Sequence, residues 1–252
     1  MDAVSWKRFA AARDEYRLYT ETLAAALPGL RSAQERLVEE REAAGFAIET
    51  PVVYNGALDD LGPADEVRLI LVADNPGRRE QAAANRRYLV GPSGKLADGF
   101  FRSRAELGID FRKDVLILNK TPIHTPRTGE LRELGRLGGT EVARAIESSQ
   151  LRMVQLIRSF HEAVRTPSGP PVPLWIIGYS ELGRGKLFEP FSRALTEAYR
   201  DDYEFRASVL LFRHFSMNQF SVDIRKRTLV GEPVGAALAR IGAEYRERVL
   251  GW

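Results

Sequence analysis

The chain has 252 residues, of which 44% are hydrophobic and 28% are charged, the proportions of an ordinary globular protein. It contains no cysteine, which excludes disulfides, thiolate catalysis and cysteine-held zinc or iron–sulfur clusters, and its three histidines are too scattered to indicate a metal site. The net charge of +3 does not by itself indicate a nucleic-acid partner, and no apolar run approaches the roughly 20 residues that cross a bilayer.

Residues 1–60 are expected to form a helical N-terminal extension packed on the main domain. Apolar residues recur at helical spacing over residues 5–45, with a break at Pro28-Gly29 and a stop at Gly45. The segment Met1–Lys7 lacks a basic region followed by an apolar stretch, so it does not resemble a secretory signal. We therefore expect a cytoplasmic protein.

Residues 61–252 are expected to form the α/β domain. Short apolar runs that read as buried strands lie at 67–73, 115–118, 174–177 and 207–212, and helical patterns lie near 94–107, 139–165, 185–200 and 232–249. A short Pro/Gly linker is expected over Thr166–Pro173. Strands that alternate with helices predict a doubly wound, mostly parallel four-stranded sheet flanked by helices.

Polar side chains follow each of the four predicted strands. The segments are Asp74-Asn75-Pro76-Gly77, Asn119-Lys120-Thr121, Gly178-Tyr179-Ser180 and His214-Phe215-Ser216. In open α/β sheets, ligands bind outside the carboxyl ends of the strands. The sequence therefore predicts a functional site where these four segments converge.

Basic residues crowd two stretches of the chain. They are Arg78, Arg79, Arg86, Arg87 and Lys95 in the first stretch, and Arg213, Arg225, Lys226 and Arg227 in the second. A basic face of this kind would suit a phosphate backbone, but arginine-rich solvated loops are also common in proteins that bind no nucleic acid.

Two segments look like phosphate-binding loops but lack the residues that perform the chemistry. Around Gly91–Lys95, Leu89 stands in the place of the first P-loop glycine, and Leu96 stands where Ser or Thr would hold magnesium. In Gly178–Gly183 the glycine spacing is right, but Arg184 replaces the lysine. Neither segment predicts ATP or GTP hydrolysis.

Four segments together resemble the uracil-DNA glycosylase superfamily. They are Leu69–Gly77, which ends in Asn-Pro-Gly; Tyr88–Leu96, with its Val-Gly-Pro-Ser-Gly loop; the apolar run Val115–Asn119; and His214-Phe215-Ser216, which is similar to a His-Pro-Ser motif. Their order and spacing across residues 67–221 carry the resemblance. It implies a uracil-DNA-glycosylase-like fold and an enzyme that acts on a base flipped out of DNA.

The resemblance implies two catalytic elements. Cleavage of the N-glycosidic bond leaves positive charge on the sugar and negative charge on the departing base. Members of the superfamily place the residue that handles water at the position of Asp74 or of Asn75; Asp74 is the stronger base and Asn75 the better motif match, and both stay open. His214 would donate to the base oxygen on which charge develops.

Further roles in base and DNA binding follow from the same resemblance. Tyr88 would stack on the flipped base, and Asn119 would bond to a pyrimidine edge through its amide. Gly77 stands where the most uracil-selective branch has a tyrosine that excludes the thymine methyl group, so broader deaminated bases are also expected as substrates. The expected DNA contacts are Ser93, Gly94 and Lys95 at a phosphate, and Ser216, Met217 and Phe220 in the loop that enters the duplex.

The expected function is therefore hydrolysis of uracil or a related deaminated base from single- or double-stranded DNA, in base-excision repair. No metal, cofactor or iron–sulfur cluster is expected, and we expect a monomer, which suits an enzyme that closes on DNA. Phe215 replaces the proline of the resembled motif, which changes the insertion loop. Two alternatives remain: a glycosylase-like DNA-binding protein without turnover, and an unrelated doubly wound enzyme acting on a phosphorylated metabolite.

Overall fold

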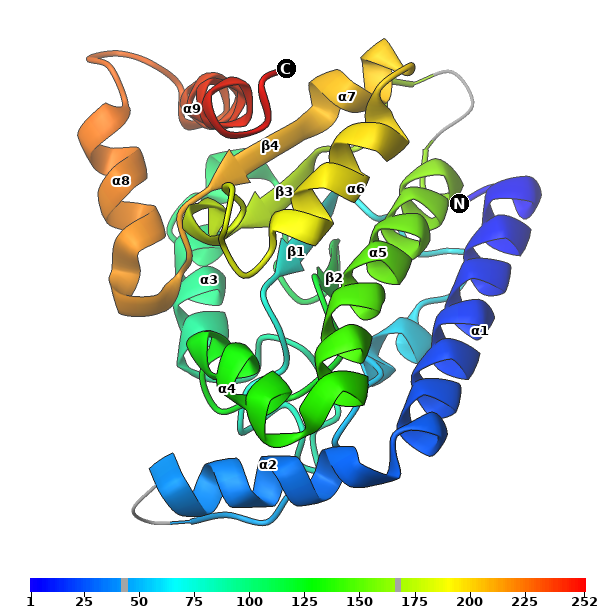
Figure 1. The fold of residues 1–252 in the computed structure, drawn as a ribbon. Coiled ribbons are helices and arrows are strands. Elements are labelled where there is room, and N and C mark those ends of the chain that lie inside the picture. The colour runs from blue at the N-terminus through cyan, green and yellow to red at the C-terminus, as the bar shows by residue number, and fades with distance from the viewer. Residues whose placement is uncertain (42–44, 166–168) are drawn as a thin grey trace.

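A computed structural model of the chain describes residues 1–41, 45–165 and 169–252. Its centre is one sheet of four parallel strands in the order β2-β1-β3-β4 (Figure 1). The strands are β1 (Leu69–Ala73), β2 (Val115–Asn119), β3 (Leu174–Ile177) and β4 (Val209–Phe212), and every residue in them is buried. This confirms the predicted α/β fold with a parallel four-stranded sheet flanked by helices.

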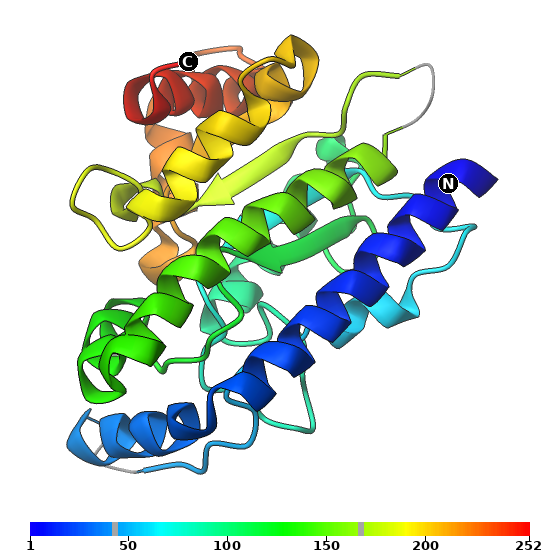
Figure 2. The ribbon, with the colours of Figure 1, turned by 45° about the vertical axis from the view of Figure 1, so that its right-hand side comes forward.

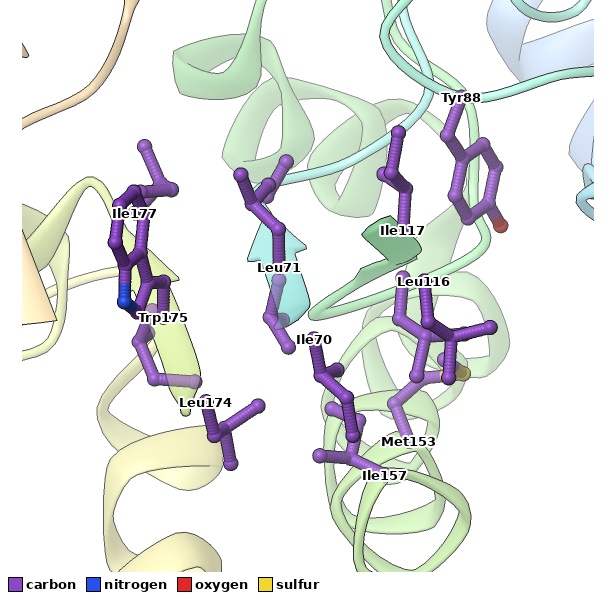
Figure 3. Close-up of a cluster of buried hydrophobic side chains, with 14 of the residues drawn as sticks. Ile70, Leu71, Tyr88, Leu116, Ile117, Met153, Ile157, Leu174, Trp175 and Ile177 are labelled. Atoms are coloured by element: carbon purple, nitrogen blue, oxygen red, sulfur yellow. The ribbon is translucent and has the colours of Figure 1, made fainter. Parts of the chain in front are cut away.

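Helices cover both faces of the sheet, as the continuous apolar strands predict. The helices α3 (Pro92–Arg102), α8 (Gln219–Arg227) and α9 (Val234–Leu250) cover one face, and α5 (Gly139–Ala163) and α6 (Glu189–Tyr199) cover the other (Figures 1 and 2). On the first face, the Trp175 ring lies 5.6 Å from Phe101 and 5.8 Å from Phe220, centroid to centroid. On the second face, Met153 and Ile157 lie in the buried cluster that Figure 3 shows.

The N-terminal helices join this core. Helix α1 (Ala3–Ala26) packs along α5, and α2 (Pro28–Arg41) packs on α4 (Leu131–Leu137). The predicted break falls at Leu27, and Pro28 opens α2, where its fixed φ suits the first helical position. Residues 42–44, which lead to the expected stop at Gly45, lie outside the described residues, as do residues 166–168 of the expected linker.

Several short elements were not predicted. Helix α4, α7 (Tyr203–Ser208) and α8 are absent from the sequence-based expectation, and α7 takes Ala207 and Ser208 from the predicted fourth strand. Single-turn 3₁₀ helices occur at Gly56–Asp60, Ala105–Leu107, Thr128–Glu130, Tyr179–Glu181 and Ser216–Asn218. In the part of the chain that the structure describes, no helix is both long and apolar enough to traverse a lipid bilayer.

Candidate functional site

A cavity of about 660 Å³ lies at the carboxyl ends of the strands. The chain runs from β1 to β2 on one side and then crosses to β3 on the other side of β1, so the strand order reverses between β1 and β3, which is where such sheets bind ligands. The lining includes Asp74, Asn75, Gly77 and Glu80 after β1; Leu89, Gly91 and Ser93 around the start of α3; Thr125 to Thr128; Gly178, Ser180 and Glu181 after β3; and His214, Ser216 and Gln219 after β4. Three of the four expected strand-end segments therefore line one cavity, whereas Asn119-Lys120-Thr121 does not and Thr125–Thr128 takes its place.

Asp74 is held at this cavity by a buried lysine. Lys120 is fully buried, and its Nζ donates to Asp74 Oδ1 and to the carbonyl oxygen of Ile177, each at 2.5 Å. Burial lowers the pKa of Lys120, while the neighbouring carboxylate of Asp74 raises it. Gly178, with φ +81°, leaves room for this pair, because a Cβ there would lie 2.8 Å from Asp74 Oδ1.

The side chain of Asn75 is oriented by the segment that follows β2. Its Nδ2 donates to Thr125 Oγ1 at 2.8 Å and to the carbonyl oxygen of Ile123 at 3.3 Å. His124 Nδ1 donates to the carbonyl oxygen of Pro76 at 2.9 Å, which fixes the turn itself. Because the amide nitrogen is engaged, Asn75 presents its Oδ1 as an acceptor, and no described residue donates to that oxygen.

His214 is fixed in one neutral tautomer. The backbone N–H of Ser216 donates to His214 Nδ1 at 3.0 Å, and Ser216 Oγ lies 2.8 Å from the same atom. Since Nδ1 accepts from a backbone N–H, the proton of the neutral ring is on Nε2. Burial lowers the pKa of His214, and the charge of Asp74 only partly opposes this. The ring therefore offers a neutral N–H donor at the cavity.

A strained residue forms part of the cavity wall. Leu89 has φ +53°, a left-handed conformation that costs a non-glycine residue about 1–2 kcal/mol. Its N–H donates to Glu80 Oε1 at 2.7 Å, and its carbonyl oxygen accepts from Arg112 at 2.7 Å. A Cβ on Gly94 would lie 1.4 Å from that carbonyl oxygen, so α3 can approach Leu89 only with glycine here. These contacts fix Leu89 at the cavity.

Glu80 is a buried carboxyl group beside the same wall. Its second oxygen, Oε2, accepts from the N–H of Gly77 at 2.9 Å, so one side chain bridges the turn after β1 and the segment before α3. Burial raises the pKa of Glu80 to about 7, although the backbone donors oppose this shift.

Two residues expected to bind the base lie elsewhere. Tyr88 does not line the cavity: it is 1% exposed, its hydroxyl donates to the carbonyl oxygen of Val53 at 2.6 Å and contacts the hydroxyl of Tyr16, and its ring lies beside Ile117 (Figure 3). Asn119 is also buried and outside the lining, and its Nδ2 lacks a hydrogen-bond partner among the described residues. The hydrophobic residue that reaches the cavity is Leu89, one position after Tyr88.

The expected DNA contacts separate into two groups. Ser93 and Ser216 line the cavity with Gly77, Lys95 is exposed nearby on α3, and Met217 is 86% exposed with φ +53° at the tip of the loop after β4. By contrast, Phe220 is 1% exposed and stacks on Phe215, and Gly94 is buried against Leu89. Phe220 and Gly94 are therefore packing residues in this structure, because each is enclosed by protein.

Sequence reasoning named Lys120 in a strand-end segment without giving it a role, and it did not place Glu80 or Leu89 at the site. Lys120 carried a detectable signal, since a lysine directly after an apolar strand must find a partner when the strand end is buried. Glu80 and Leu89 carried none, because their places depend on the path of the chain between β1 and α3. Within the described residues, no group of three His, Asp or Glu side chains could hold a metal ion.

The fold and the cavity together define an α/β protein with a carboxylate, a fixed amide and a neutral imidazole at its switch point. Comparison with protein-family models gives no match, and no curated protein matches the sequence.

Proposed function

We propose that the protein is a monofunctional DNA glycosylase of the uracil-DNA glycosylase type. It would hydrolyse the N-glycosidic bond of uracil, or of a related deaminated base, flipped out of DNA. The observation that carries this proposal is that Asp74, Asn75 and a neutral His214 line one cavity at the switch point of the sheet. The volume of about 660 Å³ is in the range of small-ligand sites and leaves room for a base and its sugar.

On the base side, His214 stabilises the leaving group. As the bond between the sugar C1′ and the base nitrogen breaks, its electron pair stays on the base and charge develops on the base oxygen. The neutral ring donates a hydrogen bond from Nε2 to that oxygen without first losing a proton of its own. The base leaves as an anion and takes its proton from solvent.

On the sugar side, the pair Asp74 and Asn75 handles the water. The water oxygen forms the new bond to C1′, and its proton passes to the Asp74 carboxylate, which an amide cannot replace as a base. Asn75 Oδ1 accepts from the same water and holds it in position. The contact of Lys120 Nζ with Asp74 Oδ1 holds the carboxyl group in position at the cavity.

The DNA would enter past basic and apolar groups at the rim. Arg78 and Arg79 are exposed beside the cavity, and Ser93 lies at the start of α3, where a phosphate finds free backbone N–H groups. The exposed Met217 at the loop tip is the side chain that would fill the gap left by the flipped base.

The test is incubation with single- and double-stranded oligonucleotides that carry uracil, hypoxanthine or xanthine, followed by alkaline cleavage at abasic sites. We expect strand scission with at least one base. Asn75→Ala and His214→Ala should each lower cleavage by orders of magnitude with little loss of DNA affinity. Absence of scission with every base would refute the activity; retained, salt-sensitive binding would then indicate a binding protein without turnover.

A further inference from the structure

A cluster of arginine and tyrosine side chains lies beside the cavity, and the proposed chemistry does not use it. We call it the Arg–Tyr cluster; its members are Tyr179, Arg213, Asp223, Arg227, Tyr245 and Arg248. The Tyr179 and Tyr245 rings pack with their centroids 4.4 Å apart. The guanidinium of Arg248 lies 5.5 Å from the first ring and 4.6 Å from the second. The tyrosines thus form a rigid platform for the arginines.

The cluster holds more positive than negative charge. Asp223 is shared: its two oxygens accept from the hydroxyl of Tyr245 at 2.9 and 2.8 Å, and it lies 3.4 Å from Arg213. Arg227 pairs with Glu244, but Arg240 uses the same carboxylate. Arg248 is exposed and pairs with no carboxylate among the described residues; its one hydrogen bond is to the hydroxyl of Tyr179 at 3.1 Å.

The chain connects this cluster directly to the cavity. Gly178 and Ser180 line the cavity, and Tyr179 between them belongs to the cluster. Similarly, His214 lines the cavity and Arg213 before it points into the cluster. Neighbouring Cα atoms are about 3.8 Å apart, so the two sites adjoin along the ends of β3 and β4. A DNA strand whose nucleotide occupies the cavity must continue across the protein surface next to the cavity.

We propose that the Arg–Tyr cluster is a second DNA-binding site, which binds the phosphodiester backbone next to the flipped nucleotide. The inference rests on the proposed function, because it takes DNA as the ligand of the cavity. Arginine suits this role because its planar fork bonds a phosphate in bidentate fashion, and its stacking on tyrosine reduces the freedom lost on binding. Arg213 and Arg248 are the exposed members, so they would make the contacts.

The test is the affinity of Arg213→Gln/Arg248→Gln for a fluorescent single-stranded oligonucleotide whose 2′-fluorinated deoxyuridine resists cleavage. Anisotropy is measured at 50, 100 and 200 mM salt. Because each phosphate contact contributes about 0.7 to the slope of log K against log salt, we expect a slope smaller by about 1.4 and a 10- to 100-fold weaker affinity at 50 mM. The matched control is Arg144→Gln/Arg193→Gln, which removes two exposed arginines from α5 and α6 on the opposite face.

Affinity and slope equal to those of the control variant would overturn the proposal, as would a wild-type protein that binds no oligonucleotide. Arg248→Gln alone, at an exposed side chain without an ion pair, provides a second variant if the double one unfolds, and should lower the slope by about 0.7. The two proposals fail separately. A wild-type protein that binds DNA through these arginines but releases no base refutes the glycosylase proposal alone. An active enzyme whose DNA affinity is unchanged by the substitutions refutes the cluster proposal alone.

Discussion

At the scale of single residues, the buried pair Lys120 and Asp74 is the feature that most constrains this site. A lysine that is fully buried needs a partner, because transfer of an isolated ammonium from water costs several kcal/mol. Lys120 finds that partner in Asp74, which also lines the cavity. The same contact therefore stabilises the fold and holds a proposed catalytic group at the cavity.

We expect Lys120→Met to destabilise the protein by about 3–5 kcal/mol, because it leaves the Asp74 carboxylate buried without its counter-ion. Urea denaturation monitored by circular dichroism measures this change. The double variant Lys120→Met/Asp74→Asn removes both charges and should recover most of the lost stability. Equal stability of wild type and Lys120→Met would show that the pair contributes nothing to folding.

The sequence placed Asp74, Asn75 and His214 correctly at this cavity and misplaced Tyr88 and Asn119. Asp74, Asn75 and His214 were predictable because each follows an apolar strand, and parallel strands bring their carboxyl ends to one edge. Tyr88 was expected in the pocket as the aromatic residue of its segment. In the structure Leu89, which has a left-handed conformation, lines the cavity, whereas Tyr88 is buried in the core. No sequence pattern shows that a leucine will adopt a positive φ.

At the scale of elements, helix α3 illustrates how one close contact can position a site. Its first turn lies against the backbone of Leu89, where a Cβ on Gly94 would lie 1.4 Å from a carbonyl oxygen. Backbone cannot move aside as a flexible side chain can, so we expect Gly94→Ala to destabilise the protein by roughly 2–3 kcal/mol or more through forced displacement of the helix. Thermal or urea unfolding measures the effect.

The same helix offers a matched control. Gly99 lies later in α3 and is exposed, and a Cβ there would meet no atom within 4 Å. Gly99→Ala should therefore stabilise the protein by about 0.5–1 kcal/mol, because alanine loses less conformational freedom in a helix than glycine. A similar change in stability for both substitutions would contradict the close contact at Gly94.

Elements were predictable in proportion to their apolar periodicity. All four strands and the long helices α5 and α9 were predictable from the sequence, because the strands bury continuous apolar runs and the helices bury a wide apolar stripe. Helix α8 did not, since only Phe220 and Ile224 of its nine residues are buried and three basic residues end it. Because the sequence did not predict helix α8, it placed Phe220 in the loop expected to enter the DNA. Phe220 packs against the rings of Phe100 and Trp175, which lie far from it in the sequence, so no local pattern reveals its burial.

At the scale of the whole molecule, the core holds titratable groups whose protonation folding alters. Burial lowers the pKa of His124 and of His161 to about 4, and it also lowers the pKa of His214 from the ordinary value of 6.5. Burial acts in the opposite direction on Glu80, whose pKa rises to about 7 from 4.5. Between pH 5 and 6, the folded protein therefore lacks the protons of His124 and His161 and holds an extra one on Glu80.

We expect the protein to lose stability as the pH falls from 6 to 5. In this window the unfolded chain binds a proton at His124 and at His161 that the native state does not bind, and the native state binds one at Glu80 that the unfolded chain lacks, a net difference of about one. Stability rises with pH wherever the unfolded state binds more protons, so these three groups should give a slope of about 1.4 kcal/mol per pH unit, and the lowered pKa of His214 acts in the same direction as those of the other two histidines. Urea unfolding in matched buffers measures it. Replacing His161 by Gln should lower the slope by about 1.4 kcal/mol per pH unit, whereas a wild-type protein whose stability does not rise from pH 5 to 6 would contradict the lowered pKa values of these histidines.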